Sequence, residues 1–254
     1  MEYLLLSNTN CMVSHSAFSI DSLKNINTEE GVSLLRKAYE GGINFYHTSD
    51  EALKTKEMLG YAFYGMRKEV FFSITSSALD SISLQQQIIQ TLDGLNSNYI
   101  DIFSIHNNNF VPKKGSTDGL YTALLSAKAD ENIKHIGFST NNLELAKEAL
   151  ISDLYDIVLL EYDFSQQELT KNDFDFIETA QNQQKGVIIN FNHSVFSHNN
   201  FSLIFGFLHK SENIIPMWNI ENQEELQQIL FFESNPPQID EKFLEEIENL
   251  KEEN

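Results

Sequence analysis

The feature that most constrains the fold is a regular alternation of short apolar runs with amphipathic stretches at helical spacing. The runs are rich in Ile, Val and Phe and mostly continuous, as expected for strands of a parallel sheet buried on both faces. They begin near residues 12, 43, 70, 99, 135, 156, 186 and 213. A helical pattern follows each run. SLLRKAYEGG, for example, places Leu34, Leu35 and Ala38 on one face and ends on glycine.

Eight such β/α units in 254 residues predict an α/β fold of the (β/α)8 type, a TIM barrel. The alternative is a doubly wound open sheet, which would normally carry a glycine fingerprint after its first strand. Neither G-x-G-x-x-G nor G-x-x-x-x-G-K-[ST] occurs in the sequence. No Ser- or Gly-rich linker divides the chain, so we expect one domain over residues 1–254, with an acidic C-terminal helix at about 238–254.

Composition narrows the classes of partner. A net charge of −20 and a pI near 4.6 argue against nucleic acid, which is bound through clustered Lys and Arg. The single cysteine, Cys11, excludes a disulfide framework and a thiolate metal site. The start, MEYLLLSNTN, does not read as a signal peptide, and no apolar run is long enough to span a bilayer. We therefore expect a cytoplasmic protein with no membrane partner.

Several motifs resemble one known family. GGINFYHTSD, followed by EMLGYAF, resembles the second strand and next helix of aldo-keto reductases, which read roughly G-I-N-F-F-D-T-A-x-x-Y-G and then L-G-x-A-L. LDGLNSNYIDIFSIH, IKHIGFSTNNLELAKEAL and IIPMWNIENQEELQQIL resemble further family motifs in the same order, over almost the whole chain. The resemblance implies a (β/α)8 barrel of the aldo-keto reductase type. It also implies reduction of carbonyls by hydride transfer from a nicotinamide cofactor, with Asp, Tyr, Lys and His at the site.

The same resemblance, taken position by position, implies departures at that site. His47 stands where the family has Asp, Ala52 where it has Tyr, and Thr75 or Ser76 where it has Lys. The family histidine alone is retained, as His106. Alanine cannot donate a proton, and neither hydroxyl can supply a fixed cation. We therefore expect that NAD(P)H-dependent carbonyl reduction has been lost.

The cofactor positions of the family also differ in this chain. Ser139 resembles the serine that contacts the nicotinamide carboxamide, and Asn141 is the other residual candidate for a cofactor contact. Leu159 replaces the usual Gln, and Met217 replaces the glycine that lets the backbone approach phosphate. Residues 218–221, WNIE, carry no basic side chain. These departures predict no cofactor, or at most weak binding of NADPH or NADH.

The carboxyl ends of the strands build the site in a barrel of this type. His47 and His106 lie at two such ends, and Asp50 or Glu161 would orient one imidazole. They predict cofactor-independent acid–base chemistry, such as isomerisation, elimination, cyclisation or hydrolysis, on a small molecule or peptide. With His193, the same histidines are candidate ligands of a divalent metal such as zinc, although no close motif spacing supports this.

Two alternatives remain open at this point. One is a pseudoenzyme whose barrel binds a ligand or a protein partner without catalysis. The other is a surviving NAD(P)-dependent oxidoreductase, which needs a proton donor other than the family tyrosine.

Overall fold

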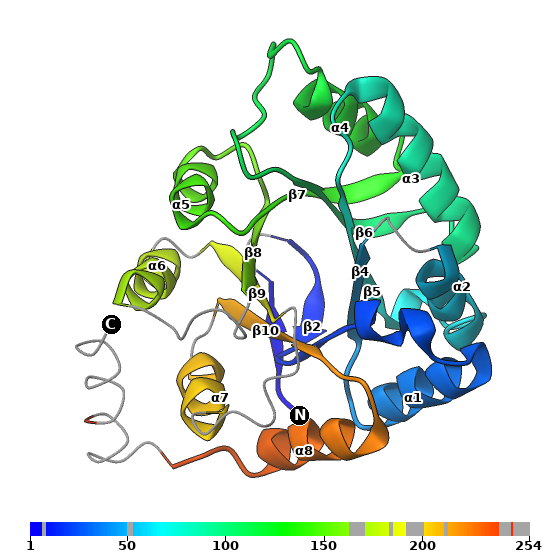
Figure 1. Cartoon of the computed structure of the whole chain (residues 1–254), viewed down its shortest axis with the longest axis vertical. Coiled ribbons are helices and arrows are strands. Elements are labelled where there is room, and N and C mark those ends of the chain that lie inside the picture. Colours follow the sequence, from blue (N-terminus) through cyan, green and yellow to red (C-terminus); the bar gives the residue numbers. More distant parts are fainter. Residues whose placement is uncertain are drawn as a thin grey trace.

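The computed structural model describes residues 1–6, 9–49, 53–162, 171–182, 185–191, 201–210, 213–238 and 245. Within these residues, eight parallel strands close into a barrel in the order β10-β3-β4-β5-β6-β7-β8-β9. Helices surround the barrel, as Figure 1 shows. This arrangement confirms the predicted (β/α)8 barrel. The barrel strands are β3 (Ala17–Ser19), β4 (Phe45–Ser49), β5 (Phe71–Ser76), β6 (Ile100–His106), β7 (Ile133–Thr140), β8 (Ile157–Tyr162), β9 (Gly186–Phe191) and β10 (Ile214–Asn219).

The helices begin where the sequence supplies side-chain caps. Asn27, Asp80, Asn142 and Asn222 each accept a hydrogen bond from a backbone N–H of the first helical turn. The predicted acidic helix at about 238–254 lies outside the described residues, apart from residues 238 and 245. The helices are α1 (Thr28–Glu40), α2 (Leu53–Ala62), α3 (Ser81–Leu95), α4 (Leu120–Ala129), α5 (Leu143–Ile151), α6 (Lys171–Asn182), α7 (Phe201–His209) and α8 (Gln223–Ser234), with 3-10 turns η1 (Asp21–Asn25) and η2 (Arg67–Glu69).

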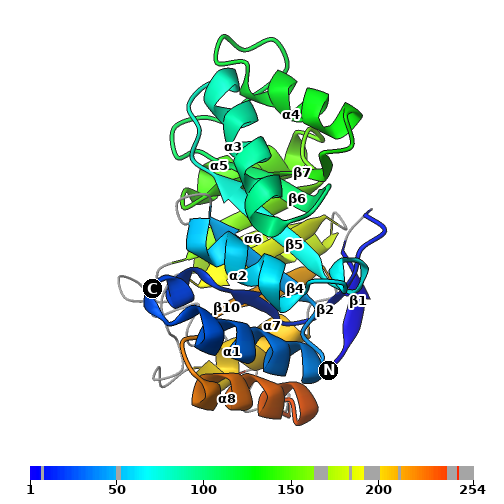
Figure 2. The ribbon, with the colours of Figure 1, turned by 90° about the vertical axis from the view of Figure 1, so that its right-hand side faces the viewer.

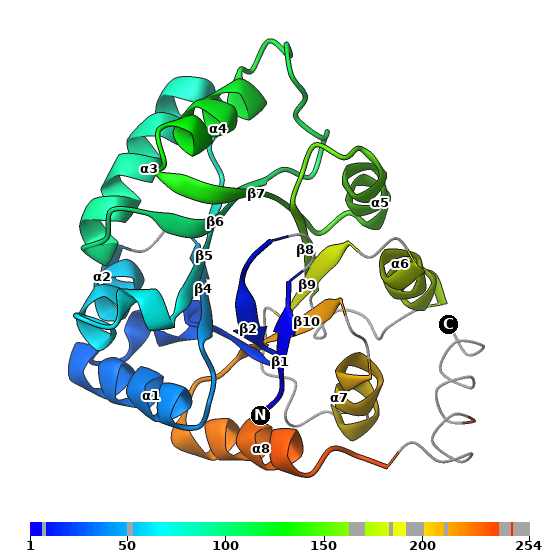
Figure 3. The ribbon, with the colours of Figure 1, turned by 180° about the vertical axis from the view of Figure 1, so that it is seen from behind.

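An antiparallel hairpin of β1 (Tyr3–Leu5) and β2 (Met12–Ser14) lies at the amino-terminal end of the barrel (Figures 2 and 3). The apolar run near residue 12, predicted as one strand, is therefore divided between hairpin strand β2 and barrel strand β3. The division occurs at Ser14, whose hydroxyl donates to the Ser16 carbonyl and whose backbone N–H donates to the Asn44 side chain at 2.7 Å. These bonds turn the chain and fasten the hairpin beside β4.

The barrel interior has an apolar floor and a polar mouth. Leu6, Cys11 and Val13 of the hairpin segment pack against inward-facing strand residues such as Ile102 and Ile157, all of them buried. Successive strand residues point to opposite faces, so every second residue beyond this floor also faces inward. Toward the carboxyl ends these inward residues become polar. They include Ser19, His47, Ser73, Thr75, Ser104, His106, Ser139, Glu161, Asn190 and Asn219.

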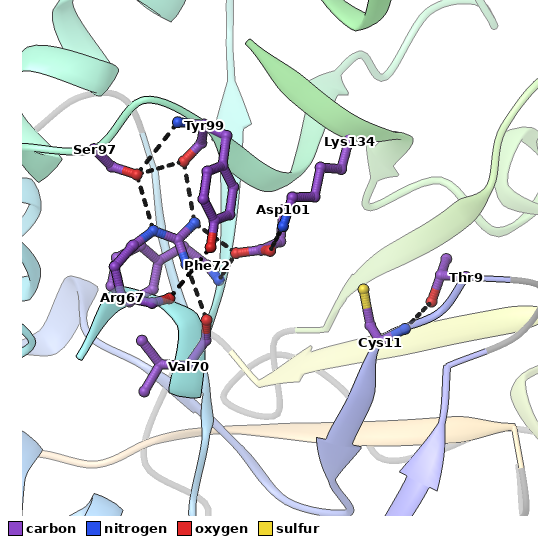
Figure 4. Close-up of polar contacts among 9 residues, drawn as sticks. All are labelled: Thr9, Cys11, Arg67, Val70, Phe72, Ser97, Tyr99, Asp101 and Lys134. Carbon is purple, nitrogen blue, oxygen red and sulfur yellow. Dashed lines mark hydrogen bonds and ion pairs between the residues drawn. The ribbon is translucent and has the colours of Figure 1, made fainter. Parts of the chain in front are cut away.

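A charged cluster outside the barrel interior joins β5, β6, β7 and η2, as Figure 4 shows. Asp101 is 1% exposed, and its carboxylate binds Arg67 at 2.6 Å and Lys134 at 3.2 Å. It also accepts the backbone N–H of Phe72 at 3.0 Å. The Arg67 guanidinium lies 4.2 Å from the Phe72 ring centroid and 4.1 Å from that of Tyr99. Cation–π contacts and ion pairs therefore fix the same arginine.

Candidate functional site

A chain of hydrogen-bonded side chains crosses the carboxyl ends of β6, β7, β8 and β9. His106 Nδ1 lies 3.0 Å from Ser139 Oγ, and the Ser139 hydroxyl donates to Glu161 Oε1 at 3.0 Å. Asn190 Nδ2 donates to the other oxygen, Glu161 Oε2, at 2.8 Å. Ser139 and Asn190 are buried, whereas His106 and Glu161 are half-buried. We call His106, Ser139, Glu161 and Asn190 the mouth relay.

The hydrogen bonds of Asn108 fix the tautomer of His106. The Asn108 Oδ1 accepts the backbone N–H of Asn141 at 2.9 Å, which turns its amide nitrogen toward His106 Nε2 at 3.0 Å. An amide nitrogen only donates, so Nε2 accepts and Nδ1 carries the proton. That proton is directed to Ser139, whose own proton goes to Glu161. His106 therefore presents a basic nitrogen at the rim and is coupled through a serine to a carboxylate.

Asn141 contributes to this arrangement through its backbone rather than its side chain. Its N–H holds Asn108 in place, and its own side chain is exposed at the rim. The sequence assigned Ser139 to cofactor binding alone. The structure shows in addition that Ser139 links the predicted residues His106 and Glu161. This link arises because His106 and Ser139 are opposite residues on β6 and β7, a register that the sequence alone does not report.

His47 lies in a different group from His106. It is 1% exposed on β4, with Nδ1 3.2 Å from the Ser73 hydroxyl of β5. Burial lowers the pKa of His47 to about 4, although the nearby Asp21 acts in the opposite direction. His47 is therefore neutral at neutral pH. In the structure His106 bonds Ser139 on the neighbouring strand β7, while His47 lies beside Ser73, and the prediction that the two histidines act together as acid and base stays a prediction.

The buried imidazole of His47 should make the fold acid-sensitive. Its folded pKa of about 4 lies below the unfolded value of about 6.5, so the unfolded chain binds more protons as pH falls. The contribution of His47 to the free energy of unfolding is complete above about pH 6.5. Roughly 2–3 kcal/mol of it should be lost as the pH falls from there to about 4. Urea unfolding at several pH values measures this loss. His47→Gln should flatten the acid limb of the curve of unfolding free energy against pH.

His135 is the matched control for this experiment. It is partly buried, but its ion pair with Asp156 at 3.8 Å and its contact with Cys11 outweigh the effect of burial and raise the pKa of His135 to about 9. A raised pKa contributes stability below about pH 6.5 that is lost as pH rises toward 9. His135→Gln should therefore change the alkaline limb and leave the acid limb as it is. An unchanged acid limb in His47→Gln would show that other groups cause it.

The structure describes some of the other predicted site positions and not others. Asp50, Ala52 and His193 lie outside the described residues, so the metal hypothesis with His47, His106 and His193 stays a prediction. Between the two candidates on β5, Thr75 faces the interior, because Ile74 packs on the helix side and Ser76 bonds Gln87 of α3. Among the described residues, no partner satisfies the buried Thr75 hydroxyl.

The profile of the Aldo/keto reductase family matches residues 16–202. The chain belongs to this family. It is similar in fold to an aldo-keto reductase from Bacillus halodurans in its holo form, with 14% identity, a TM-score of 0.81, and 99% of this chain and 96% of that chain covered. No curated protein sequence matches the chain.

Two further solved structures share the fold. One is an aldo/keto reductase from Klebsiella pneumoniae in complex with NADP and acetate, at 13% identity and a TM-score of 0.78, covering 98% of this chain and 95% of that chain. The other is the glycerol dehydrogenase from Gluconobacter oxydans, at 11% identity and a TM-score of 0.75, covering 98% and 94%. None of the described helices is long and apolar enough to cross a membrane.

These findings overturn two expectations. The expectation of no nicotinamide cofactor is wrong, because the family and its NADP-bound member point to such a cofactor. Part of the error was to place Met217 and Trp218 in a phosphate-binding loop. Both are buried residues of strand β10, and the Trp218 indole donates to Ser16 Oγ at 2.9 Å. The missing glycine therefore says nothing about the loop, which begins after Asn219.

The expectation of lost carbonyl reduction, with cofactor-independent chemistry in its place, is wrong for a related reason. The chain belongs to the Aldo/keto reductase family, whose members among the similar structures include an NADP complex and a glycerol dehydrogenase, and nothing in the described residues indicates loss of activity. The expectation assumed that only the family tyrosine can move the proton. His106, held in the mouth relay, is an imidazole suited to the same task.

Proposed function

We propose that this chain is a nicotinamide-dependent oxidoreductase that interconverts a small alcohol and its carbonyl compound at the barrel mouth. The observation that carries the proposal is the mouth relay, which couples His106 to Glu161 through Ser139 in a member of the Aldo/keto reductase family. When bound, the nicotinamide supplies or accepts the hydride. The chain supplies the proton transfer and the positioning.

The inward-facing polar residues at the carboxyl ends of the strands suit the nicotinamide ring and its uncharged carboxamide. A carboxamide offers donors and an acceptor, and the mouth presents hydroxyl and amide groups rather than a large apolar surface. The buried hydroxyl of Thr75 has no partner among the described residues and faces the interior. Ser139 and Asn141, the positions that resemble the family's carboxamide contacts, lie at the end of β7 and just beyond it. We assign these three residues to holding the nicotinamide.

His106 acts as the group that takes and returns the proton. The substrate hydroxyl replaces the Asn108 amide as the donor to Nε2, and Nε2 accepts its proton as the alcohol carbon loses hydride. The imidazolium then formed keeps its Nδ1 proton directed at Ser139. The carboxylate of Glu161 stabilises the positive charge through that serine. In the reduction direction, Nε2 donates the same proton to the carbonyl oxygen.

Binding of the cofactor can be tested directly. NADH and NADPH would be titrated by calorimetry, with thermal unfolding as a second measure, because a ligand of the native state raises stability. Trp218 is the only tryptophan in the chain, so energy transfer from it to a reduced nicotinamide gives an independent signal. Saturable binding, followed by oxidation of small alcohols, supports the proposal. Absence of binding for both cofactors at about millimolar concentration would end it.

The loop after β10 predicts a preference for NADH over NADPH. Glu221 precedes α8, and Glu224 and Glu225 occupy its first turn, while Lys37 of α1 is bound to Gln223 at 2.7 Å. The resemblance places the cofactor phosphates near this loop. A 2′-phosphate adds up to about two negative charges, so we expect NADH to bind at least about tenfold more tightly. Calorimetric dissociation constants of the two cofactors measure the ratio.

A pair of charge reversals tests the cause of that preference. Glu221→Lys should bring the dissociation constants of NADH and NADPH closer together. Glu40→Lys makes the same charge change at an exposed position at the carboxyl end of α1, away from the barrel mouth, and should leave the ratio unchanged. An equal change in both variants would show that net charge, rather than this loop, sets the preference.

A further inference from the structure

A second polar cluster lies at the amino-terminal end of the barrel, opposite the mouth. His15, between β2 and β3, and His209, at the end of α7, face each other with their Nδ1 atoms 2.7 Å apart. Glu2, from the segment before β1, places Oε2 3.7 Å from His209 Nε2. Potential ligand atoms of Glu2, His15 and His209 all lie within 4.8 Å of one another. The three side chains come from segments far apart in the sequence.

A buried carboxylate next to this cluster is incompletely satisfied. Glu233, near the end of α8, is 6% exposed, and its Oε1 accepts from the Ser16 hydroxyl. Ser16 is itself held by the Trp218 indole. Within the described part of the chain, no hydrogen-bond partner meets Glu233 Oε2. Burial raises the pKa of Glu233, and the Ser16 hydroxyl, electrostatic interaction with His209 and with the N-terminal amino group, and the backbone of Glu2 act against this rise. A carboxylate buried in this way is stabilised by neighbouring positive charge, which the N-terminal amino group supplies in part.

We propose that Glu2, His15 and His209 form a site for a divalent transition metal, with Glu233 as the buried carboxylate that offsets its charge. Two imidazoles and a carboxylate oxygen are ligands that zinc accepts in tetrahedral sites. Zinc–nitrogen bonds of about 2.0–2.1 Å would hold the two nitrogens about 3.3 Å apart. Each side chain offers one ligand atom, and the three atoms lie within 4.8 Å of one another, so they need to approach by at most about 1.5 Å to reach this spacing.

The position of the site indicates a structural role. The hairpin, α7 and α8 meet at this end of the barrel, as Figure 3 shows. A bound ion would fasten the segment before β1 and the end of α7 to the start of β3. Metal binding to the folded chain alone would raise its stability. Nothing in this role depends on the chemistry of the mouth relay.

The test uses tag-free, full-length protein treated with a chelator and then titrated with zinc. We expect one zinc ion per chain and a higher midpoint of thermal unfolding in zinc than in chelator. His209→Gln should weaken zinc binding at least about tenfold, and Glu2→Gln should also weaken it. The Glu2 side chain is exposed, so this variant tests the ligand without disturbing the fold. His135→Gln, a histidine outside the cluster, should bind zinc as the unchanged protein does.

Two results would overturn the site. One is the absence of zinc binding at about micromolar concentrations of the metal. The other is an unchanged affinity in both His209→Gln and Glu2→Gln, which would place the ion elsewhere. Cofactor titrations on the same variants separate this inference from the proposed function, because loss of zinc binding should leave nicotinamide binding intact.

Discussion

Replacing His106 with glutamine should lower kcat for alcohol oxidation by about 10²–10⁴-fold. Glutamine can still hydrogen-bond to Ser139 and Asn108, but it cannot take up a proton. Because the nicotinamide contacts assigned above do not include His106, cofactor binding should change little. Steady-state kinetics in both directions, together with calorimetry of the cofactor, measure the two effects separately. A variant with full activity would remove His106 from the reaction.

Glu161→Gln tests whether the relay acts as a unit. The amide keeps the shape of the side chain but removes the negative charge that favours a protonated imidazole at the other end of the relay. We expect a smaller loss in kcat than for His106→Gln and an acid limb of the oxidation rate displaced toward lower pH. A purely structural role for Glu161 would lower activity without moving the profile. His135→Gln, away from the mouth, serves as the matched control.

Asp101→Asn should lower the free energy of unfolding by about 3 kcal/mol or more. The change keeps an oxygen that can accept the backbone N–H of Phe72. It leaves the guanidinium of Arg67, whose side chain is 16% exposed, beside a neutral amide. Breaking a buried ion pair by removing one partner is costly, because an uncompensated charge stays behind. Urea unfolding at neutral pH measures the loss.

Lys134→Met supplies the comparison for Asp101. The Lys134 side chain is 45% exposed, so its ion pair with the same carboxylate is screened by water and should contribute less than about 1 kcal/mol. If Asp101→Asn costs no more than Lys134→Met, the cluster is an ordinary surface network rather than a buried anchor.

The sequence predicted the strands well because their apolar runs are short and separated by clear helical patterns. The apolar run NIIPMW, which begins at residue 213, predicted most of β10, whereas the family motif placed a loop glycine at Met217, inside the same strand. The sheet register agrees with the apolar run, since Met217 lies opposite Ala17 and Asn219 opposite Ser19. The motif therefore ended the strand too early.

The sequence could place candidate residues at the ends of the strands, but it could not predict the hydrogen bonds that join some of them. IDIFSIH alternates Ile102, Ser104 and His106 on one face, so the inward position of His106 follows from the sequence. Its contact with Ser139 depends on the register of β6 against β7, which no local pattern reports. The burial of His47 depends likewise on what β3 and β5 place around it. The sequence therefore shows which face of a strand a residue lies on, but not how deeply that residue is buried within the barrel.

The hairpin has a consequence for traffic through the protein. Its segment, with Leu6, Cys11 and Val13, fills the amino-terminal end of the interior, so packed side chains close this end of the described barrel. In the proposed reaction, reactant and product would therefore both pass the carboxyl ends of the strands, where His106 lies. Product would have to leave before the next substrate molecule binds, so binding and release would take place in turn at one end of the barrel.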